Sequence, residues 1–108
     1  MKLNLLVLRS RNIEAAKEFY EKLGFNFTRE KHGNGPEHYS TTDPGFVFEI
    51  YPNKIESEFE AVRIGFDLTN VTEVTRIIVP VSKREEGSQT IYIIQDPDGH
   101  KIEIKQKP

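Results

Sequence analysis

The feature that most constrains the fold of this chain is an order of hydrophobic patterns that occurs twice along its 108 residues. In the first half, a β-compatible run precedes an amphipathic helix, and further short strands follow. These predicted elements are a strand at 3–9, a helix at 13–23, and strands at 25–31, 37–42 and 46–52. Asn12 is the predicted N-cap of the helix and Gly24 its predicted stop. The first half is therefore predicted to be a βαβββ unit.

The second half repeats this order after a polar linker at 53–60. Its predicted elements are a strand at 62–68, a helix within 71–79, and strands at 79–85, 89–95 and 100–106. The helix is rich in β-branched residues, which lower helix propensity, so we expect it to be short. Asn70 and Glu73 form a capping-box pattern at its start. We therefore predict an α+β fold with two βαβββ modules, pseudo-repeats 1–52 and 61–108, which form curved mixed sheets around a cleft in a single domain, 1–108.

The composition of the chain argues against nucleic acids and membranes as partners. The formal net charge of −2 gives no general attraction to nucleic acid, and no stretch approaches the ~20 apolar residues of a membrane span. Asn4 and Arg9 interrupt the N-terminal apolar run, which argues against a signal peptide. The chain has no cysteine, which excludes disulfides, zinc–thiolate sites and thiol nucleophiles. We expect a cytoplasmic protein that binds neither nucleic acid nor membranes.

Several segments carry a resemblance to a known family. They are LVLRSRNIEAAKEFYEKLGF, VFEIYP, RIGFDL and DPDGHKIEI. Together they resemble the vicinal oxygen chelate superfamily, which holds glyoxalase I, extradiol dioxygenases, and bleomycin and fosfomycin resistance proteins. The resemblance covers nearly the whole chain. It implies the paired βαβββ (glyoxalase-like) fold, a small-molecule ligand in the cleft between the sheets, and a homodimer, which would also cover sheet edges.

The metal-dependent members of that superfamily take their ligands from the first and last strands of each half. Carried over by the resemblance, these positions fall on Leu5, Glu49, Arg63 and Glu103. Leucine cannot bind a metal, and arginine is permanently cationic. We therefore expect no family-type metal site and no cofactor, with Arg63 lying between Glu49 and Glu103 and neutralising them. A divalent metal held by Glu49 and Glu103 alone is the alternative.

His38 is the most promising histidine for a functional role. If the turn at 43–45 closes a tight hairpin, Ser40 faces Glu49 and His38 faces Tyr51. These four side chains would then form a polar cluster on one sheet face, able to bind a ligand or to shuttle protons. The alternatives are that a bulge shifts this register, or that His38 lies at an exposed sheet edge.

The other histidines and the acidic turn residues have structural explanations. His32 lies in a loop with two glycines and is expected to be solvated. His100 follows the DPDG turn and is expected to orient it. Asp96 and Asp98 are expected to be turn residues, because the rest of a calcium-binding loop is missing.

Three functions follow. The favoured one is a protein of the bleomycin-resistance type that binds a small molecule in the inter-sheet cleft without the family's metal. Its predicted ligand-binding residues are His38, Ser40, Glu49, Tyr51, Arg63, Glu103 and Leu5. One alternative is a metal-dependent lyase or dioxygenase with a rearranged site that includes His38. The other is a metal-free enzyme in which His38 or Glu49 acts as a general base and Arg63 stabilises an anionic intermediate.

Overall fold

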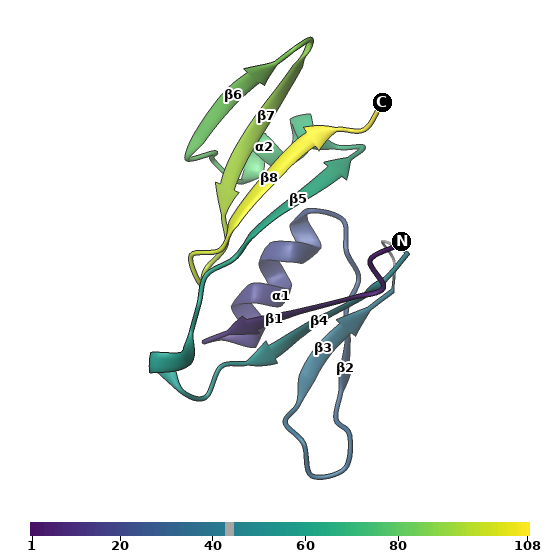
Figure 1. Cartoon of the computed structure of the whole chain (residues 1–108), viewed down its shortest axis with the longest axis vertical. Coiled ribbons are helices and arrows are strands. Elements are labelled where there is room, and N and C mark those ends of the chain that lie inside the picture. The colour runs from purple at the N-terminus through teal and green to yellow at the C-terminus, as the bar shows by residue number, and fades with distance from the viewer. Residues whose placement is uncertain (43–44) are drawn as a thin grey trace. The chain divides into compact units, whose positions relative to one another are not determined.

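A computed structural model describes residues 1–42 and 45–108. Contacts divide the chain into two compact units, unit 1 at 1–59 and unit 2 at 60–108. Each unit has the element order βαβββ and a four-stranded mixed sheet (Figure 1). The predicted α+β class with two such modules is therefore confirmed. The single domain and the cleft between the sheets concern both units together and stay predictions.

Unit 1 contains the elements predicted for the first half. They are β1 (Leu5–Ser10), α1 (Ile13–Lys22), β2 (Thr28–Glu30), β3 (His38–Thr41), β4 (Val47–Pro52) and a short 3₁₀ helix, η1 (Glu56–Glu58), in the predicted linker. The strand order is β1-β4-β3-β2, with β1 parallel to β4 and the other pairs antiparallel. The predicted tight turn at 43–45 includes Asp43 and Pro44, which lie outside the described residues.

Local sequence signals define α1. The side chain of Asn12 accepts a hydrogen bond from the backbone N–H of Ala15 at 3.1 Å, as predicted for an N-cap. Gly24 follows the helix with a φ of 113°, a conformation that favours glycine. The buried stripe of α1 packs on the sheet, where the rings of Tyr20 and Phe48 meet edge to face at 5.2 Å between centroids. Residues of the other strand parity therefore point to the opposite face of the sheet.

Unit 2 contains the elements predicted for the second half. They are β5 (Arg63–Leu68), α2 (Val71–Ile77), β6 (Ser82–Glu86), β7 (Gln89–Gln95) and β8 (Lys101–Gln106). The strand order is β5-β8-β7-β6, with β5 parallel to β8. As predicted, α2 is short, and it buries Val71 and Val74. Neither α-helix of the described residues has the length and apolar character of a bilayer span.

The predicted capping box of α2 is wrong in its main contact. The side chain of Asn70 makes no capping hydrogen bond within the described part of the chain. Instead, Gln106 at the end of β8 accepts a hydrogen bond from the N–H of Val71 at 3.4 Å. A residue distant in sequence thus replaces the local cap at the start of this helix.

Candidate functional site

The register of β3 and β4 in unit 1 is the one that the sequence predicts. Ser40 is paired with Glu49 across the two strands. The ring of His38 stacks on that of Tyr51, with centroids 4.1 Å apart and planes 10° from parallel. The observed register shows that the bulge alternative is wrong. The exposed-edge alternative is also wrong, because β3 lies between β4 and β2 and His38 is only 1% exposed.

The two ring nitrogens of His38 differ in their environment. Nδ1 lies 3.2 Å from the carbonyl oxygen of Pro36, which can only accept, so Nδ1 carries a proton. In the neutral ring this places the lone pair on Nε2. Nε2 is buried and has no hydrogen-bond partner among the described residues. The nearest carboxylate oxygens, of Glu30 and Glu49, lie 3.4 and 3.5 Å from it. A buried polar atom left unpaired costs about 1–3 kcal/mol, so its presence calls for an explanation.

Two further residues join this cluster that sequence reasoning did not assign to it. Glu30 on β2 is the cross-strand partner of His38. His32 Nε2 lies 3.5 Å from Glu30 Oε1, and its ring centroid lies 5.2 Å from that of His38. The His32 side chain is 72% exposed, as predicted for a solvated loop, yet the loop brings it beside His38. One ligand-type atom from each of these three residues lies within 4.8 Å of the others.

Tyr51 and the first strand complete this face. The guanidinium carbon of Arg9 lies 5.4 Å from the centre of the Tyr51 ring, a cation–π distance. In β1, Leu5 is paired with Val47 and is 49% exposed, whereas the partner of Glu49 is Val7. Leu5 thus supplies an apolar side chain at the edge of the face.

In unit 2, two arginines hold Glu103. Arg63 donates from Nε to Glu103 Oε2 at 2.6 Å, and Arg84 donates from Nη2 to Oε1 at 2.8 Å. Hydrogen bonds from Arg84, and then from Arg63, keep the pKa of Glu103 below its ordinary value. The predicted pairing of Arg63 with Glu103 is present. The predicted contact of Arg63 with Glu49 joins residues of different units and stays a prediction.

Arg84 was missed because it lies on a strand with a weak sequence pattern. Every residue of β6 is exposed, so hydrophobic alternation does not indicate which side chains share a face. The pairing of Arg84 with Ile91, and of Ile93 with Glu103, settles the question.

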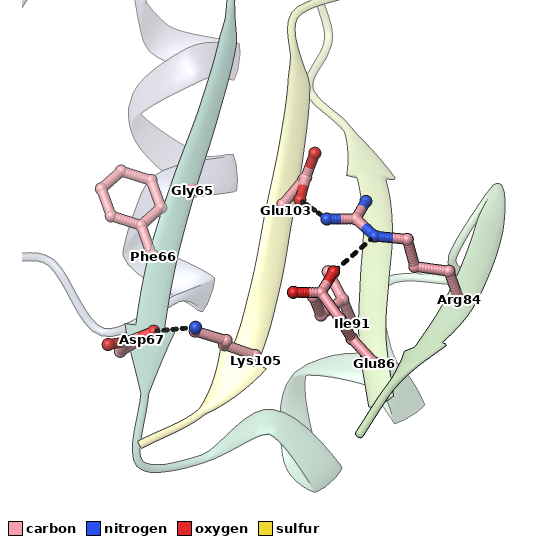
Figure 2. A pocket seen from close by; sticks show the side chains of 8 residues that line it. All are labelled: Gly65, Phe66, Asp67, Arg84, Glu86, Ile91, Glu103 and Lys105. Carbon is pink, nitrogen blue, oxygen red and sulfur yellow. Dashed lines mark hydrogen bonds and ion pairs between the residues drawn. The ribbon is translucent and has the colours of Figure 1, made fainter. Parts of the chain in front are cut away.

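A hollow of about 280 Å³ lies beside this ion-pair cluster, and Figure 2 shows Arg84 reaching from β6 towards Glu103. It is lined by Gly65, Phe66, Asp67, Arg84, Glu86, Ile91, Glu103 and Lys105. Its wall carries charges of both signs, including the pair of Lys105 and Asp67 at 3.9 Å, together with the aliphatic side chain of Ile91. Phe66 is paired with the buried Ile104, so its ring lies on the opposite face of β5. Such a mixed lining suits a small polar molecule.

The DPDGH segment has the structural role that the sequence predicts. Asp96 Oδ1 accepts hydrogen bonds from the N–H groups of Asp98 and His100, both at 2.9 Å. His100 is buried, and its Nδ1 accepts from the N–H of Val62 at 2.9 Å. This turn therefore anchors β8 to the chain entering β5.

The residues at the four family-type ligand positions do not fit a divalent ion. Leu5 offers no donor atom, and Arg63 brings a positive charge. Both oxygens of Glu103 are already engaged by guanidinium groups. Glu49 is the single remaining carboxylate of that set, and its nearby partner in unit 1 is His38.

Two βαβββ units with mixed sheets define a protein of glyoxalase-like fold. Residues 2–78 match the family described as the Glyoxalase/Bleomycin resistance protein/Dioxygenase superfamily, and the chain belongs to it. A comparison with curated proteins found no match.

Solved structures agree with this fold. One is the oxidase ChaP-H2, at 14% identity and a TM-score of 0.78, over 100% of this chain and 94% of that chain. A glyoxalase/dioxygenase from Nostoc punctiforme is 21% identical, with a TM-score of 0.70 over 99% and 91%. A bleomycin-binding protein complexed with bleomycin is 17% identical, with a TM-score of 0.66 over 100% and 99%. At these identities the likeness supports the fold alone.

Proposed function

We propose that this protein binds a small organic molecule at the sheet faces opposite its helices, without the family-type metal site. The observation that carries this proposal is the state of Glu103. Arg63 and Arg84 engage both of its carboxylate oxygens, which removes it as a metal ligand and leaves a charged hollow beside it. A structural relative was solved with bleomycin bound, so the fold accommodates binding of this kind.

The hollow in unit 2 indicates the chemistry of the ligand. Arg84 and Lys105 can pair with a carboxylate, and Glu86 and Asp67 can accept from an amine or hydroxyl group. Ile91, paired with Arg84, provides an apolar surface on the same face. We therefore expect a small polar molecule with an anionic group and a small apolar part.

The test is a thermal-shift and NMR screen of such molecules against the chain in the presence of EDTA, with Gly65→Leu as the blocking variant. A Cβ at Gly65 would meet Glu103 atoms only at 3.9 and 4.0 Å, so a side chain fits there and fills the hollow. Lys83→Leu is the matched control, since Lys83 is exposed on β6 and lies outside the hollow lining. Binding that persists in Gly65→Leu would contradict the proposed position.

An enzymatic alternative rests on His38. In the neutral ring its Nε2 has a lone pair beside Glu49, which is what a general base needs. Incubating any identified ligand with the chain and following its mass would test this alternative. Conversion that disappears in His38→Gln would support it, and an unchanged ligand would leave binding as the function.

We also propose a cytoplasmic homodimer. A chain without cysteine needs no oxidising compartment, and the exposed apolar side chains of Leu5 and Val7 on β1 suit a partner copy. Light scattering after gel filtration tests the dimer. A monomeric mass at all micromolar concentrations would overturn it.

A further inference from the structure

The environment of His38 resembles that of a metal-binding histidine. Metal-bound histidines usually donate their second ring N–H to a carbonyl or carboxylate, which fixes the tautomer and aims the lone pair at the ion. Here Nδ1 is fixed by the carbonyl of Pro36, and Nε2 is buried without a hydrogen-bond partner among the described residues. No N–H or O–H group of the described residues donates to Nε2, and the groups beside it are carboxylate oxygens, which can bind a metal ion.

The spacing of those donor atoms fits an ion. Glu30 Oε1 lies 3.4 Å from His38 Nε2 and 3.5 Å from His32 Nε2, while Glu49 Oε2 lies 3.5 Å from His38 Nε2. Two donors on a tetrahedral zinc ion, each about 2.1 Å from the metal, stand ~3.4 Å apart. These three separations match neighbouring donors around an ion, and one ligand-type atom from each of Glu30, His32 and His38 lies within 4.8 Å of the others.

The contacts of His38 Nε2 with the two carboxylates are longer than charge-assisted hydrogen bonds. A charge-assisted hydrogen bond between a cationic nitrogen and a carboxylate is about 2.7–2.9 Å long. The Arg63–Glu103 and Arg84–Glu103 contacts of unit 2, at 2.6 and 2.8 Å, are close to that range. Around His38, in contrast, two carboxylate oxygens stand back from the same nitrogen at nearly equal distances.

We infer that unit 1 contains a binding site for a divalent first-row transition metal ion, formed by Glu30, His32 and His38 with Glu49 as the fourth available donor. Imidazole nitrogens with carboxylate oxygens suit zinc and its neighbours. The exposed His32 and the 37% exposed Glu30 side chain leave a path from solvent. The site lies on the β2–β3 hairpin and goes beyond the proposed function, because it requires neither Leu5, Arg63 nor Glu103.

The test is calorimetric titration of the EDTA-treated, desalted full chain with zinc chloride, together with the absorption spectrum after adding cobalt(II). We expect saturable binding of one ion per chain and a visible cobalt spectrum of low coordination number. Glu30→Gln and His32→Ala should each weaken zinc binding at least about tenfold. Both positions are partly or largely exposed, so these variants should fold, as circular dichroism can verify. Glu73→Gln on α2, also an exposed acidic residue, is the control and should bind like the parent chain.

A direct readout reports on His38 without replacing a buried residue. Nitrogen-15 NMR of the histidine rings should show the Nε2 resonance of His38 shifting on zinc binding while the Nδ1 proton is retained. Weak unsaturable binding, or binding that both Glu30→Gln and His32→Ala leave unchanged, would overturn the inference. The Gly65→Leu variant should bind zinc normally, and the ligand screen contains EDTA. Failure of the metal site and failure of the proposed ligand site are therefore separate results.

Discussion

The two units of this chain have the same element order and strand order but opposite chemistry on their last strands. Glu49 on β4 and Glu103 on β8 are the carboxylates at equivalent positions. Glu103 is held by short hydrogen bonds from two arginines, whereas Glu49 stands 3.5 Å from a histidine nitrogen that has no hydrogen-bond partner among the described residues. The backbone thus sets where a carboxylate lies, and the neighbouring strands decide what it can do.

The two buried histidines repeat this contrast. His38 and His100 are each 1% exposed. The side chain of His100 accepts a hydrogen bond from the N–H of Val62, and its backbone N–H donates to the side chain of Asp96. His100 therefore stabilises the fold of unit 2. In His38, Nδ1 donates to the carbonyl of Pro36 in unit 1, whereas Nε2 has no hydrogen-bond partner among the described residues.

The largest expected effect concerns the cores, which differ between the units. Phe48 is fully buried and contacts the rings of Tyr20, Phe25 and Phe27 in unit 1. Phe48→Ala should lower the free energy of unfolding by about 3–5 kcal/mol, because it removes a ring and leaves a cavity. Urea unfolding measures this, with Ile104→Val in the aliphatic core of unit 2 as a mild control of about 0.5–1.5 kcal/mol. A cost below about 1 kcal/mol for Phe48→Ala would show that the aromatic cluster is not the core of unit 1.

Replacing each buried histidine by phenylalanine should separate their roles. His100→Phe leaves the N–H of Val62 without its acceptor, which should cost about 1–3 kcal/mol. His38→Phe removes the donor to the carbonyl of Pro36, but it keeps a ring to stack on Tyr51 and also removes an unpaired nitrogen, so it should cost less in metal-free buffer. Thermal unfolding in EDTA measures both variants. Equal losses would mean that His38 is as structural as His100.

The arginine clamp on Glu103 predicts a pH dependence specific to unit 2. Because Arg84 and Arg63 favour the charged carboxylate, the folded-state pKa lies below the ordinary value of 4.5. The associated stability is present above pH 4.5 and is lost as the pH falls through the lowered pKa. Arg84→Gln should raise the pKa of Glu103 and reduce this acid-dependent loss, and Arg63→Gln should do so less. Carbon-13 NMR titration of the side-chain carboxyl tests the order, and an unchanged pKa in Arg84→Gln would contradict the clamp.

The smallest expected effect compares the helix starts. Asn12→Ala removes a capping hydrogen bond from α1 and should cost about 1 kcal/mol. Asn70→Ala removes no such bond from α2, so it should change the free energy of unfolding by at most about 0.5 kcal/mol. Urea unfolding of both variants measures the difference. A larger loss of stability for Asn70→Ala would indicate that Asn70 caps α2 after all, in place of Gln106.

The sequence by itself determined the elements, their order and one register. Hydrophobic periodicity depends only on residues close along the chain, so it identified the strands and helices of both units. The cap of α1 is equally local, because Asn12 and Ala15 are three positions apart. Strand parity then placed Ser40 opposite Glu49 and His38 near Tyr51, because a side chain changes face at every step along a strand.

Tertiary structure decided which polar groups meet. A loop whose path no periodicity encodes brings His32 beside Glu30 and His38. An exposed strand with no hydrophobic alternation carries Arg84 to Glu103, and the distant Gln106 replaces the cap expected from Asn70. In each case the contact is made by polar groups distant along the chain, so no apolar pattern records the pairing and only the folded backbone specifies it.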